Sequence, residues 1–288
     1  MSYATLLVHV QPDPSMQYRL RIACDLAKRF DAMIVGIAVE MIRAAPFDDG
    51  YTSMDAQWFT AMRETALESQ KTCRAQFDLA AADVSKGTLW VTGLDFPAAA
   101  IARTSSAADL IVTSQAPNGR RDSYIDAHAA ELALISGRPV LVAPPNAAHL
   151  AAKRIVLAWK DVREARRAAS DAMPFLKAAE RVLVLEVCKT EDVADAEVRT
   201  ADVVAALTRH GVAAEGKITV GRLSDGAEII HATKVFGADL IVCGAYGHTR
   251  LSEWAFGGVT RELLKQESCF VLLSHWVCSD AAAGKVRV

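Results

Sequence analysis

The sequence has no hydrophobic run approaching the ~20 consecutive apolar residues that a membrane-spanning helix needs. Its opening residues, MSYATLLVHVQPDP, lack both a basic N-terminal region and a cleavage site. Lysine and arginine (32) nearly balance aspartate and glutamate (34), which leaves a formal net charge of −2 and no basic surplus for nucleic acid. We therefore expect a cytoplasmic protein that binds neither membranes nor nucleic acids.

The cysteines form no C-x-x-C pair, and no histidine stands near them at a spacing that suits zinc. We therefore expect no metal site. Cys24, Cys188 and Cys243 lie in apolar periodic stretches and are predicted to be buried. Cys278, in the polar tail, is left open as a reactive thiol.

Motifs of well-known enzyme classes are also missing, including G-x-S-x-G, H-E-x-x-H and paired carboxylates in one loop. Gly221 and Gly226 are spaced like those of a P-loop, but Ala227-Glu228 replaces the required Lys-Ser/Thr. Asp225 is predicted to cap the helix that follows. We assign no catalytic residue, and a slow ATPase stays open because phosphoryl transfer relies on positioning and electrostatics.

The chain of 288 residues is 52% apolar and 23% charged, which is ordinary for a globular protein and long enough for two domains. A repeat divides it: ADLIV at 108–112 recurs at 238–242, followed in each case by a second apolar stretch at nearly the same offset. We predict an N-terminal domain at residues 1–146, a C-terminal domain at 152–277 and a tail at 278–288. A short proline-stiffened linker joins the domains.

Within each repeat, short apolar runs alternate with segments of helical periodicity. This alternation predicts an α/β fold with two Rossmann-like domains, each a five-stranded parallel sheet with helices on both faces. Predicted strands are 6–10, 32–39, 89–92, 110–113 and 140–143 in the first repeat and 154–158, 182–187, 215–220, 240–243 and 269–273 in the second. Predicted helices are 16–30, 60–82 and 97–104 in the first repeat and 163–176, 194–210, 227–236 and 259–264 in the second.

The first repeat contains an insert at 41–59 that has no counterpart in the second. Its proline, its Asp48-Asp49-Gly50 turn and its aromatic residues predict a surface loop. The insert either fills space or serves as a lid; we favour the first because long loops are not always functional.

Residues 238–276 hold the stretch that looks most like a ligand site. A strand at 240–243 leads into glycines at 244, 247, 257 and 258, and a helix follows at 259–264. Backbone N–H groups and a helix dipole can converge on an anion in such an arrangement. Glycines alone leave two readings open, a phosphate site and a plain turn.

The spacing is more specific than the glycines themselves. Gly244-x-x-Gly247, nine residues and then Gly257 before a helix resembles the C-terminal half of the universal stress protein domain. In the nucleotide-binding branch of that family, Ser or Thr follows the last glycine. Here Gly258 stands in that place, and Thr260 is two residues further on. The resemblance implies a stress-response protein that binds ATP, with Mg, or another adenine nucleotide.

Ligands of doubly wound sheets bind at the carboxyl ends of the strands, where strand order reverses. The family resemblance places an aspartate after the first strand, where Lys160 falls here with Asp161 beside it. Either the acid has moved by one residue or a lysine faces the phosphates. The full candidate nucleotide site is Ala158, Trp159, Lys160, Asp161, Val187, Gly244, Tyr246, Gly247, His248, Arg250, Gly257, Gly258, Val259 and Thr260.

The first repeat departs from the glycine pattern. Ser114 and Pro117 replace the first two glycines, and Ala127-His128 replaces the later pair. Proline offers no N–H and has a fixed φ, so this loop cannot reproduce a phosphate cradle. Gln11 stands in the place of Lys160, with Asp13 two residues on. We expect a degenerate first site.

As a whole, the chain resembles a tandem universal stress protein. In that family the last strands of two domains pair across a pseudo-twofold axis, which implies that 140–143 pairs with 271–274 and that one chain mimics the dimer. A further homodimer is compatible with the sequence. Two functions remain open: nucleotide binding in the C-terminal domain, or a scaffold that binds protein partners through surfaces such as 41–59.

Overall fold

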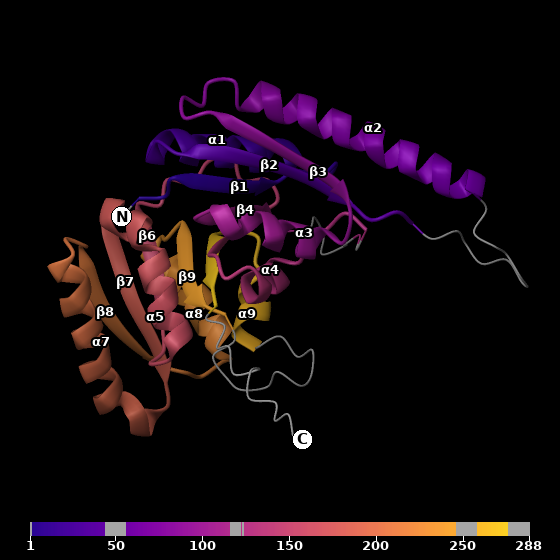
Figure 1. Ribbon diagram of the computed structural model, residues 1–288. Coiled ribbons are helices and arrows are strands. Elements are labelled where there is room, and N and C mark those ends of the chain that lie inside the picture. The colour runs from indigo at the N-terminus through magenta and orange to yellow at the C-terminus, as the bar shows by residue number, and fades with distance from the viewer. Residues whose placement is uncertain (1, 44–55, 116–121, 123, 246–257, 276–288) are drawn as a thin grey trace, which may run out of the picture.

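We analysed a computed structural model, which describes residues 2–43, 56–115, 122, 124–245 and 258–275 (Figure 1). The N-terminal half contains β1 (Thr5–His9), α1 (Met16–Phe30), β2 (Met33–Glu40), α2 (Ala56–Ala80), β3 (Thr88–Leu94), α3 (Pro97–Thr104), η1 (Ser105–Ala107), β4 (Leu110–Ser114), α4 (Ala129–Ile135) and β5 (Val140–Ala143). The C-terminal half contains β6 (Arg154–Trp159), α5 (Arg163–Asp171), α6 (Met173–Ala178), β7 (Arg181–Cys188), η3 (Thr190–Asp192), α7 (Val193–Arg209), β8 (Ala214–Val220), α8 (Asp225–Phe236), β9 (Leu240–Gly244), α9 (Gly258–Leu263) and β10 (Phe270–Ser274).

All ten of these strands join one sheet, in the order β3-β2-β1-β4-β5-β10-β9-β6-β7-β8. Neighbouring strands within each half are parallel, as predicted. The halves meet where β10 pairs antiparallel with β5, with Val271 opposite Val142 and Leu273 opposite Val140. Helices cover both faces of the sheet, so the predicted α/β class is confirmed (Figure 1).

Two hydrophobic clusters fill the space between the sheet and its helices. One lies under α1, α2, α5, α6 and α7 and includes Leu20, Phe77 and Phe175. The other lies under α3, α4, α8 and α9 and includes Ile101 and Leu263. Both clusters draw residues from both halves of the chain, so the two halves share their cores across the β5–β10 junction.

The predicted elements match the structure closely, with two exceptions in the helices, the first being α4 (Ala129–Ile135), which has no counterpart among the predicted helices. The helix predicted at 163–176 is wrong as a continuous element: α5 ends at Asp171 and α6 starts at Met173. Pro174 lies in the first turn of α6, where its missing N–H and its ring would have broken a continuous helix. Most of the insert, residues 44–55, lies outside the described residues, and α2 begins at Ala56.

Burial of the cysteines is as predicted for Cys24 and Cys243 and wrong for Cys188, which is partly exposed at the end of β7. Burial raises the pKa of Cys243 to about 12, so this thiol stays protonated at neutral pH. Cys278 lies outside the described residues. Among the described helices, none has the length and apolar character to cross a membrane.

Three aromatic rings connect the halves on the α1 side of the sheet. The ring centroids of Tyr3 and Phe30 are 5.0 Å apart, and those of Phe30 and Phe175 are 5.2 Å apart, in edge-to-face geometry. The Tyr3 hydroxyl donates a hydrogen bond of 2.6 Å to the carbonyl of Asp171, at the end of α5. This aromatic group therefore ties the start of the chain to helices α5 and α6.

We expect Phe175→Ala to lower the free energy of unfolding by about 3–5 kcal/mol, because it leaves a cavity at a fully buried site between the halves. Phe59→Ala is the matched control, since Phe59 on α2 is 41% exposed and its removal should change stability by less than about 0.5 kcal/mol. Chemical denaturation of both variants measures the difference. Equal free energies of unfolding for Phe175→Ala and Phe59→Ala would show that the aromatic group does not hold the halves together.

Histidine 9 is buried in β1, and neither ring nitrogen has a hydrogen-bond partner among the described residues. Burial, together with the positive charge of Arg19, lowers the pKa of His9 to about 3. The unfolded chain therefore binds a proton below pH ~6.5, whereas the folded protein does not until the pH nears 3. The part of the free energy of unfolding that depends on His9 being neutral is fully present above pH ~6.5. It decreases as the pH falls from ~6.5 toward 3.

As the pH falls from 6 to 4, the free energy of unfolding of the wild type should decrease by about 1.4 kcal/mol more per pH unit than that of His9→Leu. Denaturation curves at several pH values measure this difference in slope. His210→Ala, at an exposed histidine, is the control and should follow the wild-type slope. Parallel curves for wild type and His9→Leu would mean that His9 titrates normally in the folded protein.

Candidate functional site

The candidate site lies at the carboxyl ends of β6 and β9, two adjacent parallel strands with Ala158 opposite Cys243. From β6 the chain builds β7 and β8 on one side, and then β9 and β10 on the other. The strand order therefore reverses between β6 and β9. In open α/β sheets this crevice is where ligands bind.

Three of the predicted site residues pack on the same face of the sheet. Ala158 from β6, Val187 from β7 and Val259 from α9 belong to the hydrophobic cluster on the α8 and α9 side. Ala158 is 9% exposed, and Val187 and Val259 are partly buried. They provide an apolar surface beside the carboxyl ends of the strands.

Trp159 points to the opposite face and packs against the cluster under α5, α6 and α7. Its indole N–H is buried and has no hydrogen-bond partner among the described residues. Alternation along a strand explains the separation, because consecutive residues of β6 face opposite sides of the sheet. The structure therefore does not bring Trp159 to the apolar surface of Ala158 and Val187.

The two polar residues after β6 are both exposed. Asp161 accepts a hydrogen bond of 2.5 Å from the guanidinium of Arg166, one turn into α5. Asp161, which follows the position of the family's aspartate by one residue, is therefore paired with an arginine of α5, the next helix along the chain. Lys160 remains the exposed charge closest to the end of β6.

Gly244 ends β9 in contact with the backbone of helix α5. A Cβ at this position would lie 2.6 Å from the carbonyl carbon of Glu164 and 2.7 Å from the nitrogen of Ala165. The first of the predicted glycines therefore has a packing role that the sequence did not reveal: it lets the first turn of α5 approach the sheet. Glu164 itself is buried and accepts a 2.8 Å hydrogen bond from Arg163.

The chain after Gly244 is anchored to the end of β10. Ala245 donates its N–H to the carbonyl of Ser274 at 2.7 Å, and the Ala245 carbonyl lies 2.7 Å from Nδ1 of His275. These contacts fix the last described residue before the glycine-containing segment. Tyr246, Gly247, His248, Arg250 and Gly257 lie outside the described residues.

At the start of α9, Gly258 and Thr260 differ in their surroundings. Gly258 is exposed, and a Cβ built on it meets no atom of the described residues within 4 Å. Thr260 is 4% exposed, so its side chain faces the protein interior. The described residues therefore do not obstruct a hydroxyl side chain at position 258, where the family pattern has Ser or Thr.

The loop after β8 is held by a carboxylate that sequence analysis missed. Glu228 accepts hydrogen bonds from the backbone N–H groups of Arg222 (2.9 Å) and Leu223 (3.1 Å). The hydrogen bond from the Arg222 N–H is the largest cause of the lowered pKa of Glu228. In the sequence, the role of Glu228 is indicated only by its place, an acidic residue in the first turn of a helix after a glycine-rich loop. Acidic residues are common there in helices that bind no ligand.

Helix α8 is capped by Ser224, and the prediction that Asp225 caps it is wrong. The Ser224 hydroxyl accepts from the N–H of Ala227 at 3.2 Å, and Asp225 is the first helical residue. The same hydroxyl lies 2.6 Å from the Glu262 carboxylate on α9 and donates to it. The loop after β8 and helix α9 are therefore joined beside the candidate site.

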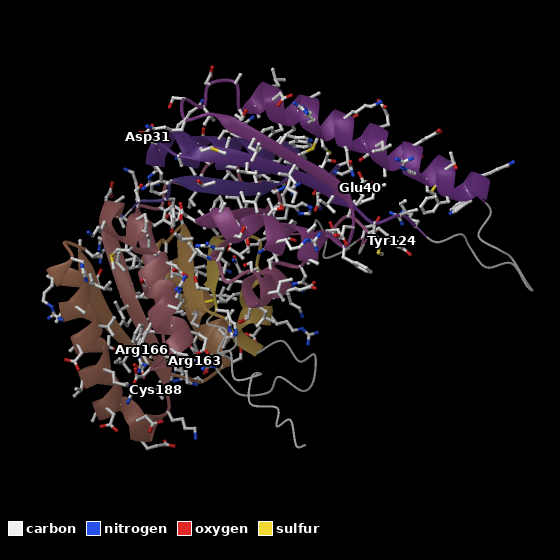
Figure 2. All side chains as sticks on the ribbon, in the orientation of Figure 1. Asp31, Glu40, Tyr124, Arg163, Arg166 and Cys188 are labelled. Atoms are coloured by element: carbon white, nitrogen blue, oxygen red, sulfur yellow. The ribbon has the colours of Figure 1, made fainter. Side chains whose placement is uncertain are left out.

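Charged side chains gather at the same edge, on the face opposite the apolar surface. Figure 2 shows Arg163, Arg166 and Cys188 near the lower end of the C-terminal half. Arg199 on α7 donates to the buried carboxylate of Glu186 at 2.6 Å. Within the described residues, no group of three or more His, Cys, Asp or Glu side chains is arranged to hold a metal ion.

Comparison with known proteins identifies the C-terminal half. Residues 151–275 match the family model described as the universal stress protein family. A universal stress protein from Archaeoglobus fulgidus DSM 4304 is 16% identical, with 94% of this chain and 98% of that chain covered and a TM-score of 0.66. A putative universal stress protein from Pseudomonas aeruginosa UCBPP-PA14 is also 16% identical, covers 95% of this chain and 93% of its own, and has a TM-score of 0.57.

A universal stress protein family protein from Arabidopsis thaliana with AMP bound covers 47% of this chain and 99% of its own, at 16% identity and a TM-score of 0.35. No curated protein is significantly similar in sequence. The two likenesses that extend over the whole chain show that both halves share the fold of universal stress proteins.

The packing of Gly244 against α5 predicts that Gly244→Ala lowers the free energy of unfolding by about 1–3 kcal/mol, because the methyl group would overlap backbone atoms. Gly258→Ala is the matched control, since it adds the same methyl group in open space and should change stability by less than about 0.5 kcal/mol. Thermal or chemical denaturation distinguishes them. A neutral Gly244→Ala would mean that α5 does not rest on this glycine.

Proposed function

We propose that the protein is a stress-response factor whose C-terminal half binds ATP or another adenine nucleotide, because residues 151–275 match the family model described as the universal stress protein family. The observation that carries this proposal is that Ala158, Val187 and Val259 all pack on the same face of the sheet. These residues come from three separate elements, and the surface lies at the edge where strand order reverses.

In this proposal the adenine base lies against the apolar surface of Ala158 and Val187. The phosphates extend toward the start of α9, where Gly258 leaves open space. Lys160, exposed at the end of β6, supplies a positive charge within reach of that edge. Tyr246, Gly247, His248, Arg250 and Gly257 complete the candidate set from the sequence pattern.

A magnesium ion, if ATP brings one, is held mainly by the phosphates. Mg²⁺ keeps several of its waters and is commonly bound through substrate phosphates and one or two carboxylates rather than by a complete protein cage. At the site edge Asp161 carries a carboxylate, but it is paired with Arg166, so a magnesium ion there would depend on the phosphates and on water. We assign no catalytic residue.

The proposal predicts saturable binding of ATP with magnesium in a calorimetric titration of the full chain. Gly258→Ser should tighten binding by about 3–10-fold, because it restores a phosphate-facing hydroxyl that contributes about 1 kcal/mol. Gly258→Ala, which adds the carbon without the hydroxyl, should bind like wild type. Absence of binding at millimolar nucleotide to both wild type and Gly258→Ser would remove the proposal.

Loss of the positive charge at position 160 provides an independent check. Lys160→Ala should weaken ATP more than adenosine, since only ATP carries phosphates for the lysine to neutralise. The ratio of the two dissociation constants, measured for wild type and variant, reports this effect. An equal loss for both ligands would place Lys160 away from the phosphates.

A second candidate function, binding of a protein partner, is favoured by exposed apolar side chains on α2. Phe59 is 41% exposed, Leu67 is 39% exposed and Leu79 is 75% exposed. Exposed apolar side chains that form a contiguous patch are typical of interaction sites. If this function is correct, replacing Phe59 and Leu67 by serine should abolish capture of the partner without changing nucleotide binding or stability.

A further inference from the structure

The ten-stranded sheet ends in β3 on one side and in β8 on the other. Each of these strands has seven residues, and neither has a further strand beside it among the described residues. An edge strand can pair with another strand through its unpaired N–H and C=O groups, and proteins commonly prevent this with charged side chains. The two edges of this sheet differ in this respect.

Strand β8 carries the charges that protect an edge. Glu215 and Lys217 are both exposed, and Glu215 forms an ion pair of 2.5 Å with Arg181 on β7. Pairing a second strand with β8 would remove these charges from water, which is costly. Strand β3, with the sequence TLWVTGL, contains no charged residue and no proline, and it exposes Leu89 (51%) and Leu94 (36%). The β3 edge therefore lacks the protection of the β8 edge.

Hydrogen bonds to β2 use alternate residues of β3. The N–H of Ile34 donates to the carbonyl of Gly87 at 3.3 Å, and the N–H of Asp95 donates to the carbonyl of Glu40 at 3.1 Å. Because the bonding residues alternate along a parallel strand, the even-numbered residues of β3 direct their N–H and C=O groups away from β2. A row of backbone donors and acceptors therefore lies along the exposed edge.

Helix α2, which lies beside β3 in Figure 1, holds this edge in place. The ring centroids of Phe77 on α2 and Trp90 on β3 are 5.3 Å apart. The buried amide of Gln70 donates to the carbonyl of Gly93 at 2.8 Å and accepts from the Thr92 hydroxyl. A strand fixed in this way has little conformational freedom left to lose when it pairs.

A groove of about 430 Å³ between α2 and β3 is lined by side chains of both elements. Two of its cations are paired within the chain, Lys71 with Glu68 at 2.9 Å and Arg74 with Asp78 at 3.4 Å. An incoming strand would therefore meet charges that are already neutralised and a strand that has none. These features favour an uncharged strand over an acidic or a basic one.

Strand β3 itself has these properties, and it fits a copy of itself in an antiparallel register. When Val91 of one chain lies opposite Val91 of the second, the outward-directed Trp90 lies opposite the outward-directed Thr92. Leu89 then lies opposite Gly93, where an added Cβ would meet no described atom within 4 Å, so there is space for the leucine. A twofold axis at Val91 relates the two strands, which makes the interface closed.

We propose that the β3 edge binds the β3 edge of a second copy of this chain, so that one sheet continues through both copies. The β5–β10 junction inside the chain is an antiparallel strand pairing of the same kind. Pairing of β3 with β8 of another copy would instead be open-ended, and the charges of β8 disfavour it. The proposal does not rest on the proposed nucleotide function.

Sedimentation velocity of the full chain tests the pairing. Wild type should dimerise at about 100 µM, because an interface of this limited size belongs to the weak class. Leu89→Lys should weaken the dimer by about tenfold or more, because it places a charge on the pairing edge. Val220→Lys is the matched control: it adds the same charge at a 40% exposed residue of β8 and should dimerise like wild type. A monomeric wild type, or a dimer that Leu89→Lys does not weaken, would overturn the proposal.

Cross-linking tests the register. Val91→Cys should form a covalent dimer on oxidation, above the background of wild type, because directly opposite residues at a non-hydrogen-bonded position are close enough for a disulfide. Leu79→Cys, at a 75% exposed residue of α2, is the control for random cross-linking and should stay at background. Equal yields from the two variants, or no covalent dimer from a Val91→Cys protein that still dimerises, would overturn the β3–β3 pairing.

Discussion

The antiparallel pairing of β5 with β10 is the interaction on which the rest of the structure depends. Each half alone would end in a strand with unpaired N–H and C=O groups, which is costly when buried. Pairing Val140–Val142 with Val271–Leu273 satisfies these groups, and all six side chains are fully buried. One continuous sheet results, and both hydrophobic clusters extend through it.

The single sheet has two places where strand order reverses, one in each half. The residues at each of these places can change independently of those at the other. In the N-terminal half, the guanidinium of Arg19 on α1 has a complete set of partners at the ends of β1 and β4. In the C-terminal half, Gly244 brings α5 onto the sheet, and Gly258 leaves space at the start of α9. Under the proposed function, the C-terminal half would bind the ligand and the N-terminal half would be its structural partner.

Sequence reasoning predicted most of the fold because the signals were local and repeated. Short apolar runs separated by helical periodicity located the strands, and α1 was predicted with both of its observed ends. The break between α5 and α6 was missed because the periodicity continues across Pro174, although the proline itself was a usable signal. The Ser224 cap was missed for a simpler reason: Asp225 beside it is an equally good capping residue.

The candidate site was less accessible from the sequence than the fold. Ala158, Val187 and Val259 were predicted as a group and do share one cluster, whereas Trp159 falls on the other face by strand alternation. Burial of Arg19 could not be foreseen, because it depends on Ser114, a partner far away in the sequence, as well as on His9 and Asp13 in the preceding strand and loop. Nothing in the spacing of a helical arginine indicates that its charge will be buried.

The most direct test of this account is mass spectrometry of the small molecules released when the protein, purified from its host, is denatured. The account predicts one adenine nucleotide for each chain, held by the C-terminal half. Release of two nucleotides per chain would contradict the assignment of the N-terminal half as a structural partner. Release of none, together with no uptake of added ATP, would contradict the nucleotide site itself.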